Sequence, residues 1–324
     1  MRVLITGGLG FIGSHTAETL LAAGHHVIIV DDLSANVVED VPGAEVHTGA
    51  HWRLGLGNAE THGLFRSFAG LDVVIHAAAP VGAVGVLRHR GHIIEQMVGA
   101  TAEAIRIARR TGARLVNISS SEVYGQPGTY HVGDDLCVRA GYTARREYAV
   151  GKMACEHMLM GAVPGVPSVS IRPFNVVGPR QTSAKGFVLP TFCEQAVAGE
   201  RLTVYRPGDQ RRALTAVWDV ADFIAGPLLT SSTVRWEGEP YNLGNRANAT
   251  TVLDLARRVL RLAGLPDDHI IMTSGAEVHG AEYAEADGHT KLPGGPPPLG
   301  WLPRVPLDVL CARTLMETPG AVRV

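Results

Sequence analysis

A tyrosine and a lysine stand four residues apart in "REYAVGK", at Tyr148 and Lys152. On a helix these two side chains share one face. A tyrosine, with a pKa near ~10, is a poor base at neutral pH, but a neighbouring ammonium favours its phenolate form. The pair therefore predicts proton transfer by a phenolate, unless it is an ordinary pair on an exposed helix.

Polar residues follow an apolar run just upstream, in "NISSSEVYG". Ser120, Ser121 and Glu122 would stand at the end of a strand, where the active sites of open α/β sheets form. This position makes them candidates for the same site as Tyr148 and Lys152. Glu122 has a simpler alternative, which is to cap the following turn or pair with an arginine.

Glycines in "ITGGLGFIGSH" predict a dinucleotide site. Gly7, Gly10 and Gly13 come directly after a predicted strand and at the start of a predicted helix. Glycine allows a tight turn and a close approach of pyrophosphate to bare backbone, and the helix N-terminus offers N–H groups to an anion. The alternative is a tight turn without a ligand.

The second predicted strand ends in two acids, Asp31 and Asp32, which lie 18 and 19 residues beyond Gly13. A carboxylate there accepts hydrogen bonds from the adenosine ribose and repels a 2′-phosphate, which favours NAD over NADP. Asp31 is the preferred candidate because it is the first acid after "VIIV". The alternative is a solvated aspartate in a turn.

The elements that would position these residues alternate along the chain. Apolar runs at 2–6, 25–32, 71–79 and 113–121 have the composition of strands buried on both faces. Segments with helical spacing lie between them, for example at 14–24 and 101–112, and both end on glycine. The pattern predicts an α/β fold, a Rossmann-like doubly wound parallel sheet with a smaller C-terminal substrate-binding α/β lobe.

The predicted division places NAD in residues 1–165 and the substrate mainly in residues 179–324. Segments at about 168–178 and 213–245 are expected to return to the NAD-binding domain. Within the second half we expect a hairpin-like segment, a last helix and a terminal Pro/Gly-rich loop. These lie at 202–217, 250–264 and 291–301.

The composition argues against several classes of binding partner. The 324 residues are 46% hydrophobic and carry 29 basic against 31 acidic side chains, so no strong field favours nucleic acid or a membrane. Neither the histidines nor the four separated cysteines have the spacing of metal ligands, so no metal is expected. The cysteines, and the lack of a signal-peptide pattern at the N-terminus, favour a soluble protein of the cytoplasm. The cysteines are Cys137, Cys155, Cys193 and Cys311.

Together these motifs resemble the extended short-chain dehydrogenase/reductase family, specifically its NAD-dependent nucleotide-sugar epimerases, dehydratases and decarboxylases. The resemblance extends over nearly the whole chain. It rests on "TGGLGFIGS" (6–14), "HAAA" (76–79), "SSSEVYG" (119–125), Tyr148 with Lys152, "RPFNVVGPR" (172–180), "GDQRRALTAVWDV" (208–220), "YNLGN" (241–245) and "LGW" (299–301).

The resemblance implies a tightly held NAD that takes a hydride from C4 of a hexose in a nucleotide sugar. Tyr148 would be the base, Ser120 would bind the same hydroxyl, and Lys152 would hold the nicotinamide ribose. The 4-keto sugar would then be epimerised, dehydrated or decarboxylated. A homodimer is also implied. The resemblance adds three further cofactor contacts: Phe11, Ile12 and Ala77.

Glu122 decides between these reactions. A 4-epimerase needs only the tyrosine, the serine and room for the keto sugar to turn, whereas a second carboxylate helps when a C5 proton is removed or a group expelled. Glu122 therefore favours a dehydratase or a decarboxylase, with Ser121 beside it. A plain 4-epimerase, in which Glu122 is structural, is the alternative.

The resemblance also implies ligands for the substrate diphosphate, namely Asn175, Arg212 and Arg180, although surface charge is an alternative for them. An arginine common in the family shortly before "LGW" is missing, and His279 is a candidate replacement. This loss motivates another reading, a nucleotide-binding or regulatory protein that lost the chemistry. A reductase that uses NAD(P)H as a diffusing cosubstrate on a non-sugar ketone is a further alternative. The intact Ser120, Tyr148 and Lys152 favour an enzyme.

Overall fold

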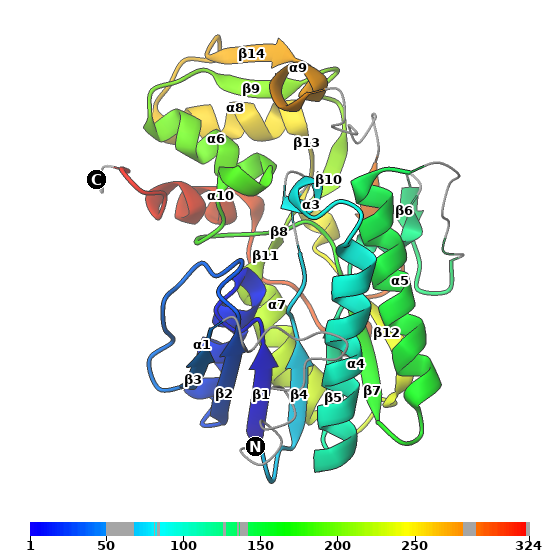
Figure 1. Cartoon of the computed structure of the whole chain (residues 1–324). Coiled ribbons are helices and arrows are strands. Elements are labelled where there is room, and N and C mark those ends of the chain that lie inside the picture. Colours follow the sequence, from blue (N-terminus) through cyan, green and yellow to red (C-terminus); the bar gives the residue numbers. More distant parts are fainter. Residues whose placement is uncertain are drawn as a thin grey trace.

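A seven-stranded sheet forms the centre of the larger lobe (Figure 1). Its order is β12-β7-β5-β4-β1-β2-β3, and every neighbouring pair is parallel. The computed structural model describes residues 1–49, 68–80, 82, 85–125, 128–134, 136, 142–280 and 290–321. The strands are β1 (Arg2–Thr6), β2 (His26–Asp31), β3 (Glu45–Thr48), β4 (Val73–His76), β5 (Arg114–Ile118), β7 (Ser168–Pro173) and β12 (Glu237–Leu243).

This order confirms the predicted doubly wound α/β class. The chain winds outward from β1 in both directions, to β2 on one side and to β4 on the other. Ligands of such sheets bind beyond the carboxyl ends of the strands at this switch point. In Figure 1 the carboxyl end of β1 points toward the smaller lobe, so a ligand at this switch point would lie on the side of the sheet that faces that lobe.

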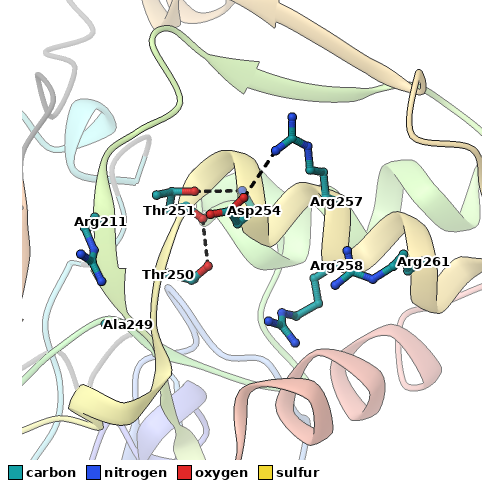
Figure 2. Close-up of a pocket in the computed structure, with 8 residues that line it drawn as sticks. All are labelled: Arg211, Ala249, Thr250, Thr251, Asp254, Arg257, Arg258 and Arg261. Carbon is teal, nitrogen blue, oxygen red and sulfur yellow. Dashed lines mark hydrogen bonds and ion pairs between the residues drawn. The ribbon is translucent and has the colours of Figure 1, made fainter.

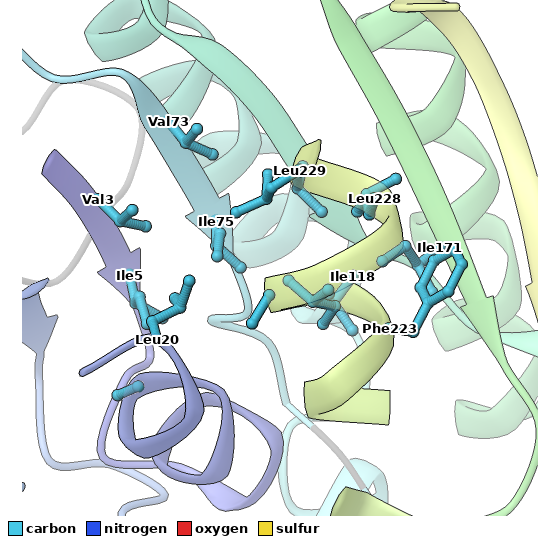
Figure 3. Packing of buried hydrophobic residues seen from close by; sticks show 14 of the residues in the cluster. Val3, Ile5, Leu20, Val73, Ile75, Ile118, Ile171, Phe223, Leu228 and Leu229 are labelled. Carbon is cyan, nitrogen blue, oxygen red and sulfur yellow. The ribbon is translucent and has the colours of Figure 1, made fainter. Parts of the chain in front are cut away.

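Helices cover both faces of the sheet because alternate residues of each strand point to opposite sides. Val3, Ile5 and Ile75 pack on one side against α1 (Phe11–Ala22) and α7 (Val217–Phe223), which π-helical η4 (Ile224–Leu228) extends; Figure 3 shows this packing. Leu4, Val74 and Leu115 pack on the other side against α4 (Ile93–Thr111) and α5 (Ala144–Ala162). Continuous apolar runs therefore produce strands buried on both faces, as expected from the sequence.

The smaller lobe contains most of the chain after β7. Its own hydrophobic core joins α6, α8 and α10. The remaining strands form a four-stranded sheet, β13-β10-β15-β6, and the pairs β11-β8 and β14-β9. These elements are β6 (Gly128–Tyr130), β8 (Val176–Val177), α6 (Val188–Val197), β9 (Leu202–Tyr205), β10 (Arg211–Ala213), β11 (Thr215–Ala216), β13 (Ala249–Thr251), α8 (Val252–Ala263), β14 (Ile270–Thr273), α9 (Gly275–His279), β15 (Lys291–Pro293) and α10 (Leu307–Met316).

Short helical elements complete the described part of the chain: α3 (Gly85–Arg88), η2 (Ser121–Tyr124), η3 (Ser183–Lys185), η5 (Arg246–Asn248) and η6 (Pro298–Gly300). η2 lies directly beyond the carboxyl end of β5, where the sequence places the candidate active site. None of the helices in the described ranges has the length and apolar character that crossing a bilayer requires.

The expected hairpin in residues 202–217 is wrong. β9 pairs with β14, and β10 pairs with β13 and β15, so the two neighbouring segments belong to different sheets. Both find partners far along the chain, which local spacing does not reveal. The helix at 250–264 is also not the last one, since α9 and α10 follow it.

The loop expected over 291–301 contains a strand at its start. β15 pairs in parallel with β6 and meets β10 only at Lys291. Pro293, at the end of β15, faces only β6, so its missing N–H removes no bond to a second neighbour. This strand carries Lys291 toward the larger lobe.

Candidate active site

The glycine turn between β1 and α1 has no room for side chains. Gly7 has a φ of +69°, and a Cβ on it would lie 2.8 Å from the backbone of Ala78. A Cβ on Gly13 would lie 2.3 Å from the carbonyl oxygen of Gly7, and one on Gly10 3.1 Å from the same atom. The turn therefore exposes bare backbone at the start of α1, whose first residues are Phe11 and Ile12. The free N–H groups there can hold a pyrophosphate.

Gly13→Ala is expected to weaken NAD binding by about tenfold or more, because the turn must shift to accommodate the methyl group and such overpacking costs ~1–3 kcal/mol. Titration of the purified protein with NAD measures the effect. The matched control is Gly161→Ala near the end of α5, where a Cβ meets no atom within 4 Å. Equal NAD affinity of the Gly13 variant and the parent would contradict the assignment of the turn.

Asp31 ends β2 beside this turn. One carboxylate oxygen, Oδ2, accepts the backbone N–H of Leu9 at 3.0 Å, and the other, Oδ1, accepts that of Leu33 at 2.9 Å. Burial raises the pKa of Asp31, and these two hydrogen bonds oppose the rise. Each oxygen can accept another bond, so Asp31 can still hold ribose hydroxyls. Asp32 instead accepts bonds from Ser34.

Ala77 follows β4 on the opposite side of β1 from Asp31, and its N–H donates to the carbonyl of Thr6 at 3.0 Å. The preceding residue, His76, is buried between two threonines. Burial lowers the pKa of His76 to about 3, so the ring is neutral. The hydrogen bond between Ala77 and Thr6 places the backbone after β4 beside the glycine turn, as the cofactor motif requires.

Helix α5 carries Tyr148 and Lys152 along one face, and Thr143 caps its first turn by accepting the N–H of Arg146 at 3.1 Å. The Lys152 ammonium donates to the carbonyl of Ile118, at the end of β5, at 2.6 Å, and lies 5.8 Å from the centre of the Tyr148 ring. Tyr148 also shares a hydrogen bond with Ser120. The predicted tyrosine, lysine and serine therefore meet at the carboxyl end of the sheet.

Burial shapes the proton affinities of this group. It raises the pKa of Tyr148 well above its ordinary value, and the hydrogen bond from Ser120 only partly opposes this. It also lowers the pKa of Lys152 to about 8, although Cys155 and Glu156 favour the ammonium. The phenol is thus protonated in the protein alone, and forming the phenolate requires further positive charge beside it.

Glu122 lies in η2 between two cations. Arg145 donates Nε to Oε2 at 2.9 Å and Nη2 to Oε1 at 3.0 Å, while Lys291 Nζ donates to Oε1 at 2.5 Å. Burial favours the neutral acid, but the two cations outweigh it and hold the pKa of the Glu122 carboxyl far below its ordinary range. Glu122 is therefore a persistent carboxylate and a weak base. Ser121, the next residue toward the strand, is buried.

A buried network of hydrogen bonds and one ion pair holds η2 in place. Arg172 on β7 pairs with Glu156 on α5 at 2.6 Å and donates to the Tyr124 hydroxyl at 2.9 Å. That hydroxyl donates to Asn242 on β12 at 2.7 Å, and Glu156 also accepts the hydroxyl of Ser119. The network ties β7, β12 and α5 to the segment that carries Ser120 and Glu122.

The residues predicted to hold the substrate are less concentrated. Asn175 has a φ of +42° and donates weakly to the Ala213 carbonyl at 3.4 Å. Arg180 binds Ser14 at 3.1 Å and Glu18 at 2.6 Å, both on α1. Arg212 lies on β10 opposite Lys291. The three roles stay predictions, and the side chain of His279 lies outside the described residues.

A cavity of about 500 Å³ lies apart from these residues; Figure 2 shows the residues that line it. Arg211 and the arginines of α8 line it together with β13. Successive residues of a strand face opposite sides, so this cavity lies behind the strand that presents Arg212 to Lys291. It is therefore not the candidate active site.

Comparison with known proteins places this geometry in a family. The model of the NAD dependent epimerase/dehydratase family matches residues 3–244. The chain belongs to this family. Among curated relatives, UDP-glucuronic acid decarboxylase 1 of Xenopus tropicalis is 31% identical over 95% of this chain and 69% of its own. UDP-N-acetyl-alpha-D-glucosaminuronate decarboxylase of Bacillus cytotoxicus is 32% identical over 75% of each chain.

Solved structures of the family share the fold. UDP-glucose 4-epimerase of Thermus thermophilus, solved in complex with NAD, is 28% identical with a TM-score of 0.76, covering 99% of this chain and 100% of its own. An epimerase of Methanothermobacter thermautotrophicus has a TM-score of 0.80 at 22% identity, covering 98% and 91%. The expectation of an NAD-dependent nucleotide-sugar enzyme is confirmed at the level of the family.

Sequence reasoning offered an arginine partner for Glu122 as an alternative but identified neither Arg145 nor Lys291. Arg145 lies three residues before Tyr148, so helical spacing alone could have placed it on the same face. Lys291 has no such local signal, because it reaches Glu122 across 169 residues of chain. The pair of Arg172 and Glu156 was missed for the same reason.

Proposed function

We propose that this protein decarboxylates a nucleotide hexuronate, with a UDP-linked sugar as the first candidate, through a 4-keto intermediate. The observation that carries the proposal is the ion-paired carboxylate of Glu122 next to Ser120 and Tyr148. The two curated relatives described above support it, because both are named as decarboxylases of UDP-linked sugar acids.

The charge of Glu122 distinguishes decarboxylation from dehydration. Expelling a hydroxyl requires a group that can donate a proton to it, and a carboxyl with a strongly lowered pKa is a poor donor. A ketone at C4 turns a C5 carboxylate into a β-keto acid, which loses CO2 without a base. A carboxylate held between Arg145 and Lys291 is thus compatible with decarboxylation and ill suited to dehydration.

Three residues of the chain have separate roles in the oxidation at C4. Tyr148 would take the proton from the C4 hydroxyl, Ser120 would orient that hydroxyl, and Lys152 would favour the phenolate. The chemistry that NAD supplies when bound is acceptance of the C4 hydride and its later return. After CO2 leaves, the C5 enolate takes up a proton and the ketone at C4 is ready for reduction.

Incubation with NAD and UDP-glucuronate is expected to yield a nucleotide sugar lighter by one CO2, detected by mass spectrometry, without net accumulation of NADH. UDP-glucose is the matched control, since it lacks only the carboxylate and should yield no lighter product. A product lighter by water would make the protein a dehydratase. An unchanged mass with a new stereoisomer would make it a 4-epimerase, and steady consumption of added NADH would indicate a reductase.

We also infer that two copies associate through α4 and α5. These helices lie side by side over one face of the central sheet (Figure 1). A groove of about 460 Å³ between them is lined by apolar side chains, including Ala102, Ile105 and Met158, and by Arg106 and Arg109. A second copy of the same pair would cover this apolar surface by a twofold contact. Light scattering that gives the mass of one chain would reject the dimer.

A cytoplasmic location is the remaining part of the proposal. Cys155, Cys193 and Cys311 are buried free thiols. Burial raises the pKa of each thiol, which keeps all three protonated and unreactive. Reduced thiols suit the redox state of the cytoplasm. Fractionation of cells that produce the protein would test the location.

A further inference from the structure

Lys291 is an unusual lysine because it is almost fully buried. Only 6% of it is exposed, whereas lysines are rarely buried without a paired charge. Its ammonium has three N–H bonds, and Glu122 is its single hydrogen-bond acceptor among the described residues. A buried cation with spare donors is costly unless another anion completes its contacts.

Other positive charges lie close to Lys291. Glu122 supplies one negative charge, while Arg145 and Lys291 supply two positive charges in direct contact with it. Arg212, on the strand beside Lys291, adds a further positive charge that acts on the lysine. Lys291 therefore lies among other cations, and an anion placed beside its spare donors would be attracted to it.

The cluster lies beside the groups that would handle O4 of the sugar. The backbone N–H of Glu122 donates to Ser120 Oγ at 3.1 Å, and Ser120 shares a hydrogen bond with Tyr148. Arg145 precedes Tyr148 by one turn of α5. A sugar whose C4 hydroxyl meets Tyr148 and Ser120 would therefore bring a substituent of an adjacent ring carbon near this cluster, and C5 is adjacent to C4.

We propose that Lys291, together with Arg145, selects nucleotide sugars that carry a carboxylate on C5. The carboxylate would share the two cations with Glu122 and use the spare donors of Lys291, which a neutral hydroxymethyl group cannot neutralise. The inference rests on the proposed function in placing O4 at Tyr148. The arginine that is common in the family shortly before "LGW" is missing from this chain. Lys291 on β15 would instead supply a cation that recognises the substrate.

Equilibrium binding tests this without relying on turnover. In a Tyr148→Phe background loaded with NAD, we expect UDP-glucuronate to bind more tightly than UDP-glucose. Adding Lys291→Met should reduce that preference by about tenfold or more, as for loss of a hydrogen bond to a charged group, whereas Lys291→Arg should retain most of it. The matched control is Arg211→Met, which removes one positive charge from the opposite face of β10 and should leave the preference unchanged.

A pH series of the protein with Lys291 intact provides a second measurement. Burial lowers the pKa of Lys291 to about 8, although Glu122 favours its charged form. The preference for UDP-glucuronate should therefore decline between pH 7 and pH 9 as Lys291 loses its proton. Arg145 and Arg212 keep their charges, and any effect of Lys152 acts on both ligands and cancels in the ratio. The Lys291→Arg variant should lose this pH dependence.

Several results would overturn the inference. The first is a preference for UDP-glucuronate over UDP-glucose that Lys291→Met leaves unchanged. The second is a preference that does not depend on pH in the protein with Lys291 intact. The third is equal binding of the two ligands at pH 7. None of them would by itself refute decarboxylation, because loss of CO2 by the unmodified enzyme is measured separately. Conversely, a Lys291-dependent preference without CO2 release would uphold the inference and refute the proposed reaction.

Discussion

Replacing Tyr148 by phenylalanine is expected to lower kcat by about 10²- to 10⁴-fold, the usual contribution of a general base, with little change in substrate affinity. The variant removes only the hydroxyl oxygen, so the ring still packs on α5 and Lys152 keeps its bond to Ile118. Ser120 cannot replace Tyr148 as the base, because a serine hydroxyl is a far weaker acid than a phenol and stays protonated at neutral pH. Single-turnover reduction of bound NAD by UDP-glucuronate measures the step directly.

Tyr142→Phe is the matched control for this experiment. Tyr142 is 57% exposed and its hydroxyl donates to Glu147 at the start of α5, so the same atom is lost outside the site. We expect kcat to be unchanged in this variant. A Tyr148→Phe enzyme that reduces NAD at the parental rate would exclude Tyr148 as the base, and with it the arrangement proposed for O4.

Local spacing was enough to predict most of the fold and the centre of the site. The apolar runs became strands because a parallel sheet buries both faces, as Leu4 and Ile5 illustrate by packing on opposite sides of β1. The glycine turn and the pair of Tyr148 and Lys152 follow from spacing within one element or one turn. Fold class and family could therefore be predicted from the residues alone.

Contacts between distant segments could not be predicted in this way. The sequence made Glu122 a candidate but did not identify Arg145 and Lys291, whose charges hold down the pKa of its carboxyl, and Lys291 comes from a segment expected to be loop. The same limitation produced the erroneous hairpin, because β9 and β10 both pair with strands later in the chain. Periodicity describes which face of an element is apolar and does not identify what that face meets.

Glu156→Leu is expected to reduce the free energy of unfolding by about 3–5 kcal/mol, the cost of leaving a buried charge without its partner. Arg172 is 2% exposed and Glu156 is fully buried, so water cannot replace the lost carboxylate. Ser119 loses its acceptor at the same time. Urea unfolding of the protein without NAD measures the change.

The surface pair of Arg235 and Glu237 provides the comparison. Their side chains are 71% and 57% exposed, so Glu237→Leu should leave the free energy of unfolding nearly unchanged. The double substitution Arg172→Met with Glu156→Leu removes both buried charges and should recover much of the lost stability, because the penalty comes from the unpaired guanidinium. A double variant as unstable as Glu156→Leu alone would instead place the cost in the bonds to Ser119 and Tyr124. In that case the network would act mainly by fixing η2, and the loss of stability should be accompanied by a loss of activity.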